Sequence, residues 1–254
     1  MSDIFPSPFR RAYVQEYGPG EMEPEHAAAQ AVLEGRGLQC VRFNLKALHR
    51  NRIPVDRTSL YIGDHDVIAS VLKRLGLVTE RETYPQSLLP FLHRRIWEST
   101  PARLRQGFGT GDYLPIFVKP RYRSKYFTGF VAQSDNDLYL LETLAKRTPL
   151  YCAEVVRWQA EFRVFVQQDR VVGVRNYAGN PELLPDPETV ADMLLALREA
   201  GEATAGYGID VGILDNGKTA LVEWNDGFAL GAYGLNDAAY TGLLVARWAE
   251  IVAE

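Results

Sequence analysis

Three oxygen-bearing side chains are spaced along the chain so that they could meet at one end of a β-hairpin. Residues 210–226 read DVGILDNGKTALVEWND, two apolar runs joined by the turn sequence DNG, which is a strong signal for a tight hairpin. Asp210 begins the first run. Glu223 and Asn225 end the second and lie two residues apart, so both leave the same face of a strand. Carboxylate and amide oxygens suit a hard cation such as Mg²⁺, although a solvated strand end would also carry acids.

Two lysines and a glycine further upstream have the chemistry to meet an anion. Lys119 ends the apolar run LPIFVK and precedes a proline, and the basic segment that follows contains Lys125 and Gly129. Backbone N–H groups and lysine charges in a glycine-containing turn between two strands are suited to covering phosphates. Both features also have a purely structural interpretation. Lys119 would then be a lysine that extends from a strand end into solvent, and the basic segment would be the exposed tip of a hairpin.

Two arginines fall on neighbouring strands. The segment EFRVFV, residues 161–166, alternates strictly, so Glu161 and Arg163 share one face and the apolar residues share the other. The polar turn QQDR then leads into VVGVR, which ends at Arg175. In an antiparallel pair Arg163 and Arg175 could face one site, and bidentate arginines are common partners of phosphate. The other interpretation is the solvated face of a half-buried sheet.

The composition restricts the class of protein. The 254 residues are 46% hydrophobic and 24% charged, an ordinary mixture for a globular chain of one large or two modest domains. A formal net charge of −4 argues against a nucleic-acid-binding protein. The N-terminus lacks the apolar core of a signal peptide, and no run is long enough for a membrane span. The two cysteines, Cys40 and Cys152, are too few for a zinc site or a disulfide framework, so we expect a cytoplasmic protein.

Alternating strand and helix patterns over the first 105 residues predict a small open α/β domain. Strands are expected at 12–16, 38–43 and 60–62, and helices at 24–34 and 64–75. Asp64 is the expected N-cap of the second helix, whose apolar residues recur at helical spacing. A further helix is expected over 88–97, with Arg94 and Arg95 on a solvated face.

The second part of the chain begins after a glycine-containing loop. Residues 103–111 read RLRQGFGTG, whose glycine spacing fits neither common phosphate-loop pattern, so we interpret the segment as a flexible connection. It places the domain boundary between residues 105 and 106. Downstream, strands are expected at 114–119, 150–156, 161–166 and 171–175 before the hairpin, and helices at 137–146, 187–200 and 237–253.

Taken in order, these features resemble the ATP-grasp superfamily. The order is a strand-end lysine, a basic glycine turn, a strand bearing an acid, an ExR strand, a second arginine, a helix, and then the acids and amide of the hairpin. The segments FVKP, SKYFTGFV, EVVRWQAEFRVFV and LVEWNDGFALGAYG resemble more narrowly an ATP-grasp clade named for two arginines and a lysine. The resemblance covers residues 114–234 well and the N-terminal domain loosely.

The resemblance implies a fold and a domain arrangement. The fold is α/β (α+β), an ATP-grasp domain over residues 106–254 in which two α+β subdomains grip a nucleotide, with a hinge near 154–158. The α/β domain of residues 1–105 precedes it.

The resemblance also implies roles for residues around a bound ATP. Lys119 corresponds to the lysine that contacts the nucleotide phosphates. Lys125 and the turn through Gly129 correspond to the mobile loop that covers these phosphates. Arg163 and Arg175 correspond to the pair that faces the γ-phosphate and the acyl-phosphate.

Further residues correspond to the adenosine and metal sites of the superfamily. The hinge segment holds the adenine edge, and an acid after it meets the ribose or organises the phosphate site; these residues are Glu154, Val155, Val156 and Glu161. The magnesium ligands correspond to Asp210, Glu223 and Asn225. Asp226 follows where many members carry a small residue, which leaves room for a different substrate contact.

The function implied is an ATP- and Mg²⁺-dependent ligase that joins a carboxylate to an amine through an acyl-phosphate. Such chemistry requires no covalent protein nucleophile, in keeping with a sequence that lacks a Ser/His or Cys/His constellation. Two alternatives are an ATP-grasp kinase that stops at phosphoryl transfer and a non-catalytic nucleotide-binding module. The expected partners are ATP, a carboxylate substrate and an amine acceptor, with neither nucleic acid nor membrane, and a homodimer is left open.

Overall fold

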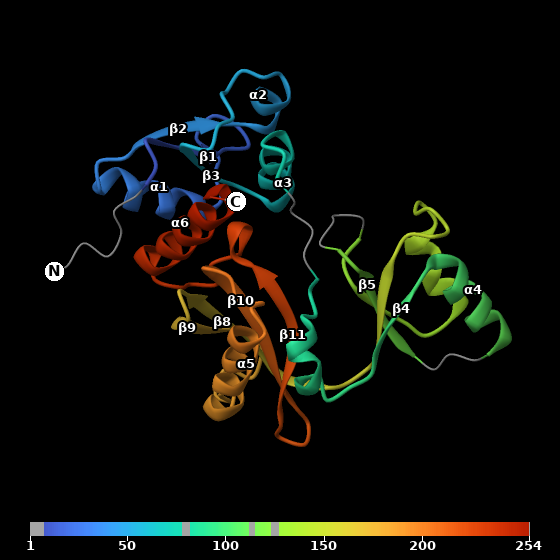
Figure 1. Ribbon diagram of the computed structural model, residues 1–254. Coiled ribbons are helices and arrows are strands. Elements are labelled where there is room, and N and C mark those ends of the chain that lie inside the picture. The colour runs from blue at the N-terminus through green and yellow to red at the C-terminus, as the bar shows by residue number, and fades with distance from the viewer. Residues whose placement is uncertain (1–7, 78–81, 112–114, 123–126, 254) are drawn as a thin grey trace.

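The N-terminal part of the chain forms a small parallel sheet. The computed structural model describes residues 8–77, 82–111, 115–122 and 127–253 (Figure 1). The sheet has the order β2-β1-β3 and consists of β1 (Arg11–Gln15), β2 (Gln39–Phe43) and β3 (Ser59–Ile62). Its helices are α1 (Pro24–Gly35), α2 (Leu45–His49) and α3 (His65–Arg74). The predicted open α/β domain is confirmed, because all three strands run parallel and helices connect them.

A second, antiparallel sheet forms a small α+β unit, which we call the small subdomain. Its order is β4-β7-β5-β6, with β4 (Ile96–Ser99), β5 (Ile116–Pro120), β6 (Phe130–Ala132) and β7 (Leu150–Glu154). Helix α4 (Pro101–Thr110) and the 3₁₀ helix η2 (Asp135–Leu141) bury apolar side chains against one face of this sheet. The opposite face is left for the cavity described below.

A third sheet, also antiparallel, forms the large subdomain. Its order is β11-β10-β8-β9, with β8 (Trp158–Gln167), β9 (Arg170–Gly179), β10 (Gly206–Leu214) and β11 (Thr219–Asp226). Helix α5 (Pro187–Glu199) packs on one face, while the 3₁₀ helix η3 (Gly227–Ala229) and helix α6 (Asp237–Ala253) pack on the other. The predicted hairpin is β10 and β11. Within the part of the chain that the structure describes, no helix is both long and apolar enough to cross a membrane.

Two predicted helices are wrong. Residues 88–91 end the 3₁₀ helix η1 (Gln86–Phe91), residues 92–95 lie in neither helix nor strand, and residues 96–97 begin β4. Pro90 lies inside the 3₁₀ turn and cannot continue an α-helix. Of residues 137–146, the first five belong to the 3₁₀ helix η2 and the rest form turns, so no α-helix is present there. The 3₁₀ helix begins at a capping box between Ser134 and Asp137.

The predicted connection at 103–111 is also wrong, because most of this segment is helix α4. The Thr100 hydroxyl accepts a hydrogen bond of 3.3 Å from the backbone N–H of Arg103, and Pro101 occupies the first turn. Gly111 ends the helix with a φ of 76°, a left-handed conformation that favours glycine. The segment therefore has a helix N-cap at Thr100 and a helix C-cap at Gly111, although its glycines suggested a loop.

The predicted domain boundary between residues 105 and 106 falls inside α4. Strand β4 on its N-terminal side pairs with β7 on its C-terminal side, with Ile96 opposite Ala153. We therefore propose that the division between the N-terminal domain and the two subdomains lies before β4.

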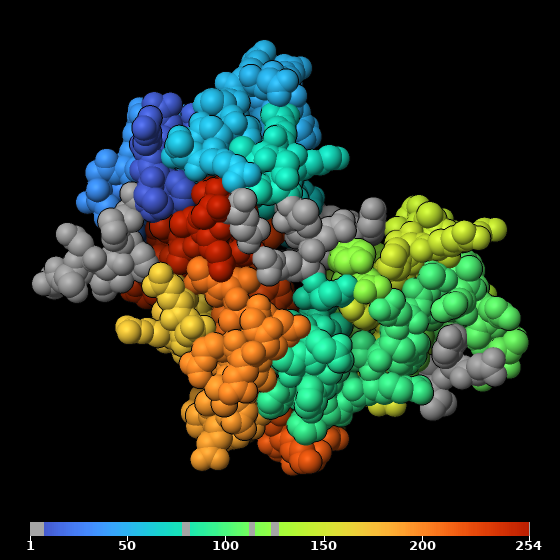
Figure 2. Space-filling view, viewed as in Figure 1, coloured from blue at the N-terminus to red at the C-terminus, as the bar shows by residue number. Residues whose placement is uncertain are grey.

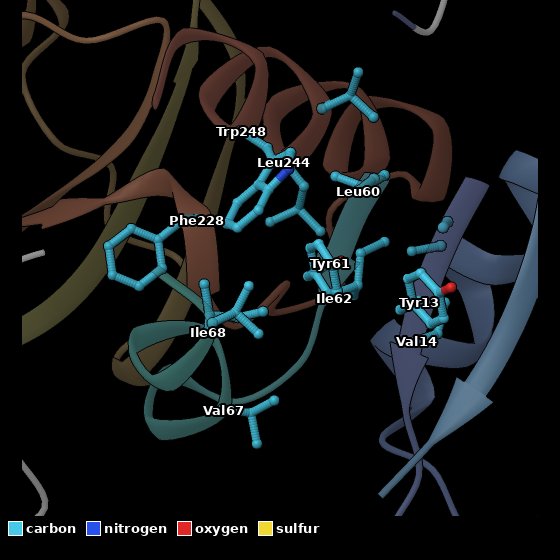
Figure 3. Packing of buried hydrophobic residues seen from close by; sticks show 14 of the residues in the cluster. Tyr13, Val14, Leu60, Tyr61, Ile62, Val67, Ile68, Phe228, Leu244 and Trp248 are labelled. Atoms are coloured by element: carbon cyan, nitrogen blue, oxygen red, sulfur yellow. The ribbon is translucent and has the colours of Figure 1, made fainter. Parts of the chain in front are cut away.

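The C-terminal helix α6 belongs to the core of the N-terminal domain. Leu244 and Trp248 of α6 lie against Leu60 and Tyr61 of β3 (Figure 3), and the indole Nε1 of Trp248 donates a 2.8 Å hydrogen bond to the backbone carbonyl of Ser59. In Figure 2 the red surface of α6 lies directly beneath the blue N-terminal domain. Because α6 also packs on the β8–β11 sheet, it joins the N-terminal domain to the large subdomain.

We predict that Trp248→Ala destabilises the protein by about 3–5 kcal/mol, the usual effect of truncating a buried Trp. Trp248 is 1% exposed, and its removal also leaves the carbonyl of Ser59 without its donor. Urea unfolding followed by circular dichroism measures the change. Val252→Ala on the same helix, at a partly buried position, is the control and should cost much less. A Trp248→Ala variant within about 1 kcal/mol of the unaltered protein would contradict this account of the core.

Candidate functional site

A cavity of about 310 Å³ lies between the small and large subdomains. Phe117 and Lys119 of β5 line it from one side, and Glu161 of β8 and Glu223 of β11 from the other. The segment Glu154, Val155 and Val156 crosses between the two sheets and lines it as well. Six residues that the sequence singled out are thus brought to one cavity by two different sheets.

Lys119 and Glu223 form an ion pair across this cavity. Nζ of Lys119 lies 2.7 Å from Oε2 of Glu223, and it stands 4.3 Å from the centre of the Tyr84 ring. Burial by itself lowers the pKa of this ammonium, but Glu223 and the Tyr84 hydroxyl raise it by more, so the net pKa lies above the usual value. Lys119 is therefore charged at neutral pH, and its side chain lines the cavity.

Arg163, Asp210 and Asn225 form a buried polar cluster next to the ion pair. The guanidinium of Arg163 donates two parallel hydrogen bonds of 2.7 Å to the two oxygens of Asp210, the bidentate geometry of a strong charged pair. The Asn225 amide donates a third bond of 3.1 Å to the same carboxylate. Each of these residues is less than 5% exposed, which excludes the interpretation of Arg163 as part of a solvated sheet face.

Arg175 lies on the strand next to Arg163, as the strand pattern predicted, and is directly opposite it in the β8–β9 ladder. Its Nε donates a 3.0 Å hydrogen bond to the carbonyl of Gly234. The neighbouring Tyr233 lies over Arg163, with 4.9 Å between the guanidinium carbon and the ring centre. Both arginines therefore meet the segment that follows β11.

Glu161 carries a carboxylate in an unfavourable environment. Its pKa is raised, chiefly by burial and further by the charges of Asp210 and Glu223. Tyr177 opposes this shift through a 3.1 Å hydrogen bond from its hydroxyl to Oε2 of Glu161. The Tyr177 ring in turn stacks on Tyr233 at 5.2 Å between ring centres. Aromatic side chains therefore cover the acid and Arg163 together.

Two predicted elements of the site lie at its edge. Gly129 packs over β5, and a Cβ built there would lie 2.5 Å from Cζ of Phe117 and 3.3 Å from Cβ of Lys119. Glu154 is exposed and accepts a 2.9 Å hydrogen bond from the backbone N–H of Arg95. Lys125 lies outside the residues that the structure describes.

Comparison with known proteins decides the family. A family model for the ATP-grasp domain, family 2 of the clade named for two arginines and a lysine, matches residues 91–243. The chain belongs to this family. None of the curated proteins searched matches this sequence.

Solved structures show the same fold over nearly the whole chain. The D-cycloserine synthetase DcsG aligns with a TM-score of 0.62 at 10% identity, covering 93% of this chain and 99% of that one. The D-alanine–D-alanine ligase of Bacillus anthracis complexed with ATP aligns with a TM-score of 0.60 at 12% identity, covering 96% and 98%. A RimK-domain ATP-grasp protein of Sphaerobacter thermophilus gives 0.58 at 11% identity, covering 92% and 98%. The predicted ATP-grasp fold is confirmed.

The donor set of the hairpin suits a magnesium ion in an ATP-grasp protein. Asp210 and Glu223 are directly opposite each other in the β10–β11 ladder, and Asn225 contacts Asp210. All three offer oxygen, the donor that Mg²⁺ prefers. Among the described residues no cluster of three or more His, Cys, Asp and Glu side chains is placed to hold a metal, so a metal here depends on the Asn225 amide and on phosphate oxygens. Both carboxylates face cations, and these pairs must loosen when a metal arrives.

Two residues that the sequence analysis did not assign to the site, Arg94 and Trp158, also line the cavity. Arg94 is not on a solvated helix face: its guanidinium donates hydrogen bonds to the carbonyls of Leu221 and Val222 at 2.5 Å and 3.0 Å. It also lies 5.2 Å from the centre of the Trp158 ring, which packs on Gly212 of β10 so closely that a Cβ there would lie 2.3 Å away. A glycine inside an apolar strand often marks the close approach of another group. Gly212 is therefore the sequence feature that could have indicated the contact with Trp158.

We predict that Glu161→Gln stabilises the protein at pH 7. The folded-state pKa of Glu161 is raised, so its contribution to stability is full below the ordinary glutamate pKa of about 4.3 and is lost as pH rises through the folded pKa. Glutamine carries no charge and can still accept the Tyr177 hydrogen bond. The gain should therefore be present at pH 7 and shrink towards pH 4.

Urea midpoints measured at pH 7, 5.5 and 4 test this pH dependence. Glu188→Gln on the exposed surface of α5 makes the same chemical change away from the cavity and is the control. A gain for Glu161→Gln that does not vary with pH would show that the charge of Glu161 is not its source.

Proposed function

We propose that this chain is an ATP- and Mg²⁺-dependent ligase that joins a carboxylate to an amine through an acyl-phosphate. The observation that carries the proposal is the Lys119–Glu223 ion pair in the cavity between the two subdomains, together with the cluster of Arg163, Asp210 and Asn225 beside it on β8, β10 and β11. Solved neighbours include a D-alanine–D-alanine ligase complexed with ATP, a macrocyclase bound with a precursor peptide and a D-cycloserine synthetase. Their names support ligation without identifying the substrates of this chain.

The cavity would hold the adenosine of ATP. Its walls are apolar where Phe117, Val156 and Trp158 line it, and the exposed backbone between β7 and β8 would meet the adenine edge, as an unpaired strand end can. Val155 belongs to the same segment. Glu161 would meet the ribose hydroxyls, for which a carboxylate is an effective acceptor.

The phosphates would lie where the positive charges converge. Lys119 and the turn with Lys125 and Gly129 would cover them, and Arg163 and Arg175 would face the γ-phosphate from β8 and β9. Nucleotide phosphates offer Lys119 and Arg163 new partners, which frees Glu223 and Asp210 to hold Mg²⁺ with Asn225. When bound, the metal offsets charge on the β- and γ-oxygens during phosphoryl transfer.

The proposed reaction needs two steps. A carboxylate oxygen of the substrate attacks the γ-phosphorus, the bond to the β–γ bridging oxygen breaks, and ADP leaves. The amine nitrogen then attacks the carbonyl carbon of the acyl-phosphate, inorganic phosphate departs, and the amine loses one proton. The protein orients the reactants and excludes water, which would otherwise hydrolyse the acyl-phosphate.

The first experiment measures ADP release by the purified protein with Mg²⁺ and pooled carboxylates and amines, with products resolved by mass spectrometry. A ligase requires two added compounds and yields a product lighter than their sum by one water. A single phosphorylated compound would instead indicate the kinase. Nucleotide binding without turnover in every pool would favour a binding module. Cytoplasmic location and a homodimer stay predictions.

We predict that Glu223→Ala lowers Mg²⁺-dependent ATP turnover at least 100-fold, because it removes a metal ligand on a metal-dependent path. The overall fold should be retained, since Glu223 is partly exposed, although the substitution also removes the ion pair with Lys119 inside the site. Turnover is measured over a range of Mg²⁺ concentrations, with circular dichroism as the check on folding. Glu188→Ala on α5 is the control. Turnover that stays within a few-fold of the unaltered enzyme would remove Glu223 from the proposed metal site.

We predict that Arg175→Ala lowers turnover by a factor of ten or more but weakens nucleotide binding less than threefold. Arg175 would act on the γ-phosphate during transfer, where charge develops, and less on the bound ground state. Turnover numbers and calorimetric titration with a non-hydrolysable ATP analogue separate the two effects. Arg170→Ala, at the exposed start of the same strand, is the matched control. A collapse of affinity with unchanged turnover per bound nucleotide would contradict this role.

A further inference from the structure

A tyrosine occupies a turn position at which its residue type is disfavoured. Residues 232–235 follow η3 and form a turn closed by a 2.8 Å hydrogen bond from the backbone N–H of Leu235 to the carbonyl of Ala232. Its two central residues, Tyr233 and Gly234, have φ angles of 46° and 75°. Positive φ at both central positions is the pattern of a type I′ turn, where Gly, Asn and Asp predominate. Gly234 fits this pattern, but Tyr233 adopts it only because its surroundings impose it.

Contacts with the core and with β9 impose this conformation. Leu235 is 4% exposed, and a Cβ built on Gly173 of β9 would lie 2.3 Å from its Cδ1. Ala232 packs against the hydrophobic cluster that contains Leu235, and Nε of Arg175 donates a 3.0 Å hydrogen bond to the carbonyl of Gly234. The turn is thus held on both sides of its tyrosine and cannot relax without breaking these contacts. Strained residues that persist in this way gather at functional sites.

The imposed conformation places the Tyr233 ring over Arg163. The ring centre lies 4.9 Å from the guanidinium carbon, close enough for the aromatic face to attract the cation. The ring also stacks on Tyr177, with 5.2 Å between the ring centres and 26° between the two planes. The Tyr177 hydroxyl is itself fixed by a 3.1 Å hydrogen bond to Glu161. Tyr233 is therefore anchored both through its backbone and through its ring.

Arg163 has donors left for a ligand. In the described part of the chain its hydrogen bonds run from Nε and Nη2 to Asp210, although a guanidinium carries five N–H donors. The backbone of β10 limits the space around its stem, because a Cβ built on Gly208 would lie 3.2 Å from Cδ of Arg163. Nη1 can therefore donate to an anion while the Tyr233 ring covers the guanidinium.

The proposed reaction removes the acid that orients Arg163. Under that function Asp210 turns to Mg²⁺, so Arg163 loses its bidentate partner when the nucleotide and the metal bind. A second acid beside Arg163 would repel the phosphates. An aromatic ring carries no net charge, and stacking on a guanidinium leaves the donors at the edge of that group available. Tyr233 can thus keep Arg163 in place after Asp210 has changed partners.

We propose that Tyr233 is a positioning residue that keeps Arg163 aligned with the transferred phosphoryl group, an assignment that rests on the proposed ligase function. A donor that is already oriented stabilises the charge that develops on the phosphoryl oxygens without having to reorganise. The strain in the turn is then the cost of this placement, because the residues that suit the turn, Asn and Gly, carry no ring.

Three variants separate the ring from the turn that carries it. Tyr233→Asn removes the ring and keeps the turn, since Asn-Gly is the preferred sequence of a type I′ turn. Its urea midpoint should stay close to that of the unaltered protein, because relief of the strain offsets the lost contacts of the ring. Tyr233→Phe keeps the ring. Gln168→Asn is the matched control: Gln168 and Asp169 have φ angles of 47° and 62° in the β8–β9 turn, which does not line the cavity.

Calorimetric titration with ADP and Mg²⁺, with and without aluminium fluoride, tests the positioning role. Aluminium fluoride takes the place of the phosphoryl group in transfer, so it should strengthen ADP binding to the unaltered protein, to Tyr233→Phe and to Gln168→Asn. In Tyr233→Asn this gain should fall about tenfold or more, because a donor to the phosphoryl group is misplaced. The affinity for ADP alone should not change, since ADP does not reach Arg163.

The outcomes distinguish this proposal from the proposed function. An equal gain from aluminium fluoride in Tyr233→Asn would overturn the positioning role. A parallel loss of affinity for ADP alone would also overturn it, because the ring would then serve the structure of the whole site. ADP binding without any gain in the unaltered protein would show that Arg163 does not meet the phosphoryl group. Failure of the unaltered protein to bind ADP at all would overturn the proposed function itself, and this inference with it.

Discussion

The ion pair between Lys119 and Glu223 is the interaction on which the arrangement of the site depends. It crosses from β5 of the small subdomain to β11 of the large one at 2.7 Å. Two charges removed from water are stabilised only when each meets a close partner. Arg163 and Asp210 repeat this arrangement on β8 and β10. The site therefore contains matched positive and negative groups before any ligand is bound.

Under the proposed function, this charge balance would let one site receive both a polyanion and a metal. Arginines and lysines without partners would repel one another, and acids without partners would raise one another's pKa values. For Glu161, burial is the main cause of the raised pKa, and the charges of Asp210 and Glu223 add to it. Pairing lets the acids and bases share a small space. Under the proposed function, ATP phosphates would become the partners of Lys119 and Arg163, and Mg²⁺ would become the partner of Glu223 and Asp210, so no buried charge would be left alone. Either ligand alone would leave one member of each pair unpaired.

Helix α6 holds the N-terminal domain and the large subdomain together. It packs on the β8–β11 sheet with one side and on β3 with the other (Figure 1). The N-terminal domain and the loop after β11 consequently have a defined relation. A Cβ built on Gly231 of that loop would lie 3.8 Å from Oε1 of Glu25 and 3.7 Å from Cζ of Tyr233.

The sequence by itself determined the local parts of this protein. The DNG turn and the two-residue spacing of Glu223 and Asn225 specify the hairpin, because turn chemistry and strand alternation act between near neighbours. The alternation of EFRVFV and the polar turn after it predicted Arg163 and Arg175 on adjacent antiparallel strands, and the structure places them directly opposite each other. The order of the motifs was enough to identify the ATP-grasp family, since it reflects the whole chain rather than one signal.

Only the tertiary structure decided which distant groups meet. Arg94 read as a solvated residue, yet its guanidinium binds carbonyls of β11 that lie more than a hundred positions away. Residues 101–110 form helix α4, capped by Thr100 and Gly111, although the glycines within them suggested a loop. The role of α6 in the N-terminal core depends on packing between the two ends of the chain. These contacts depend on three-dimensional proximity, and patterns within a short window of sequence carry no information about it.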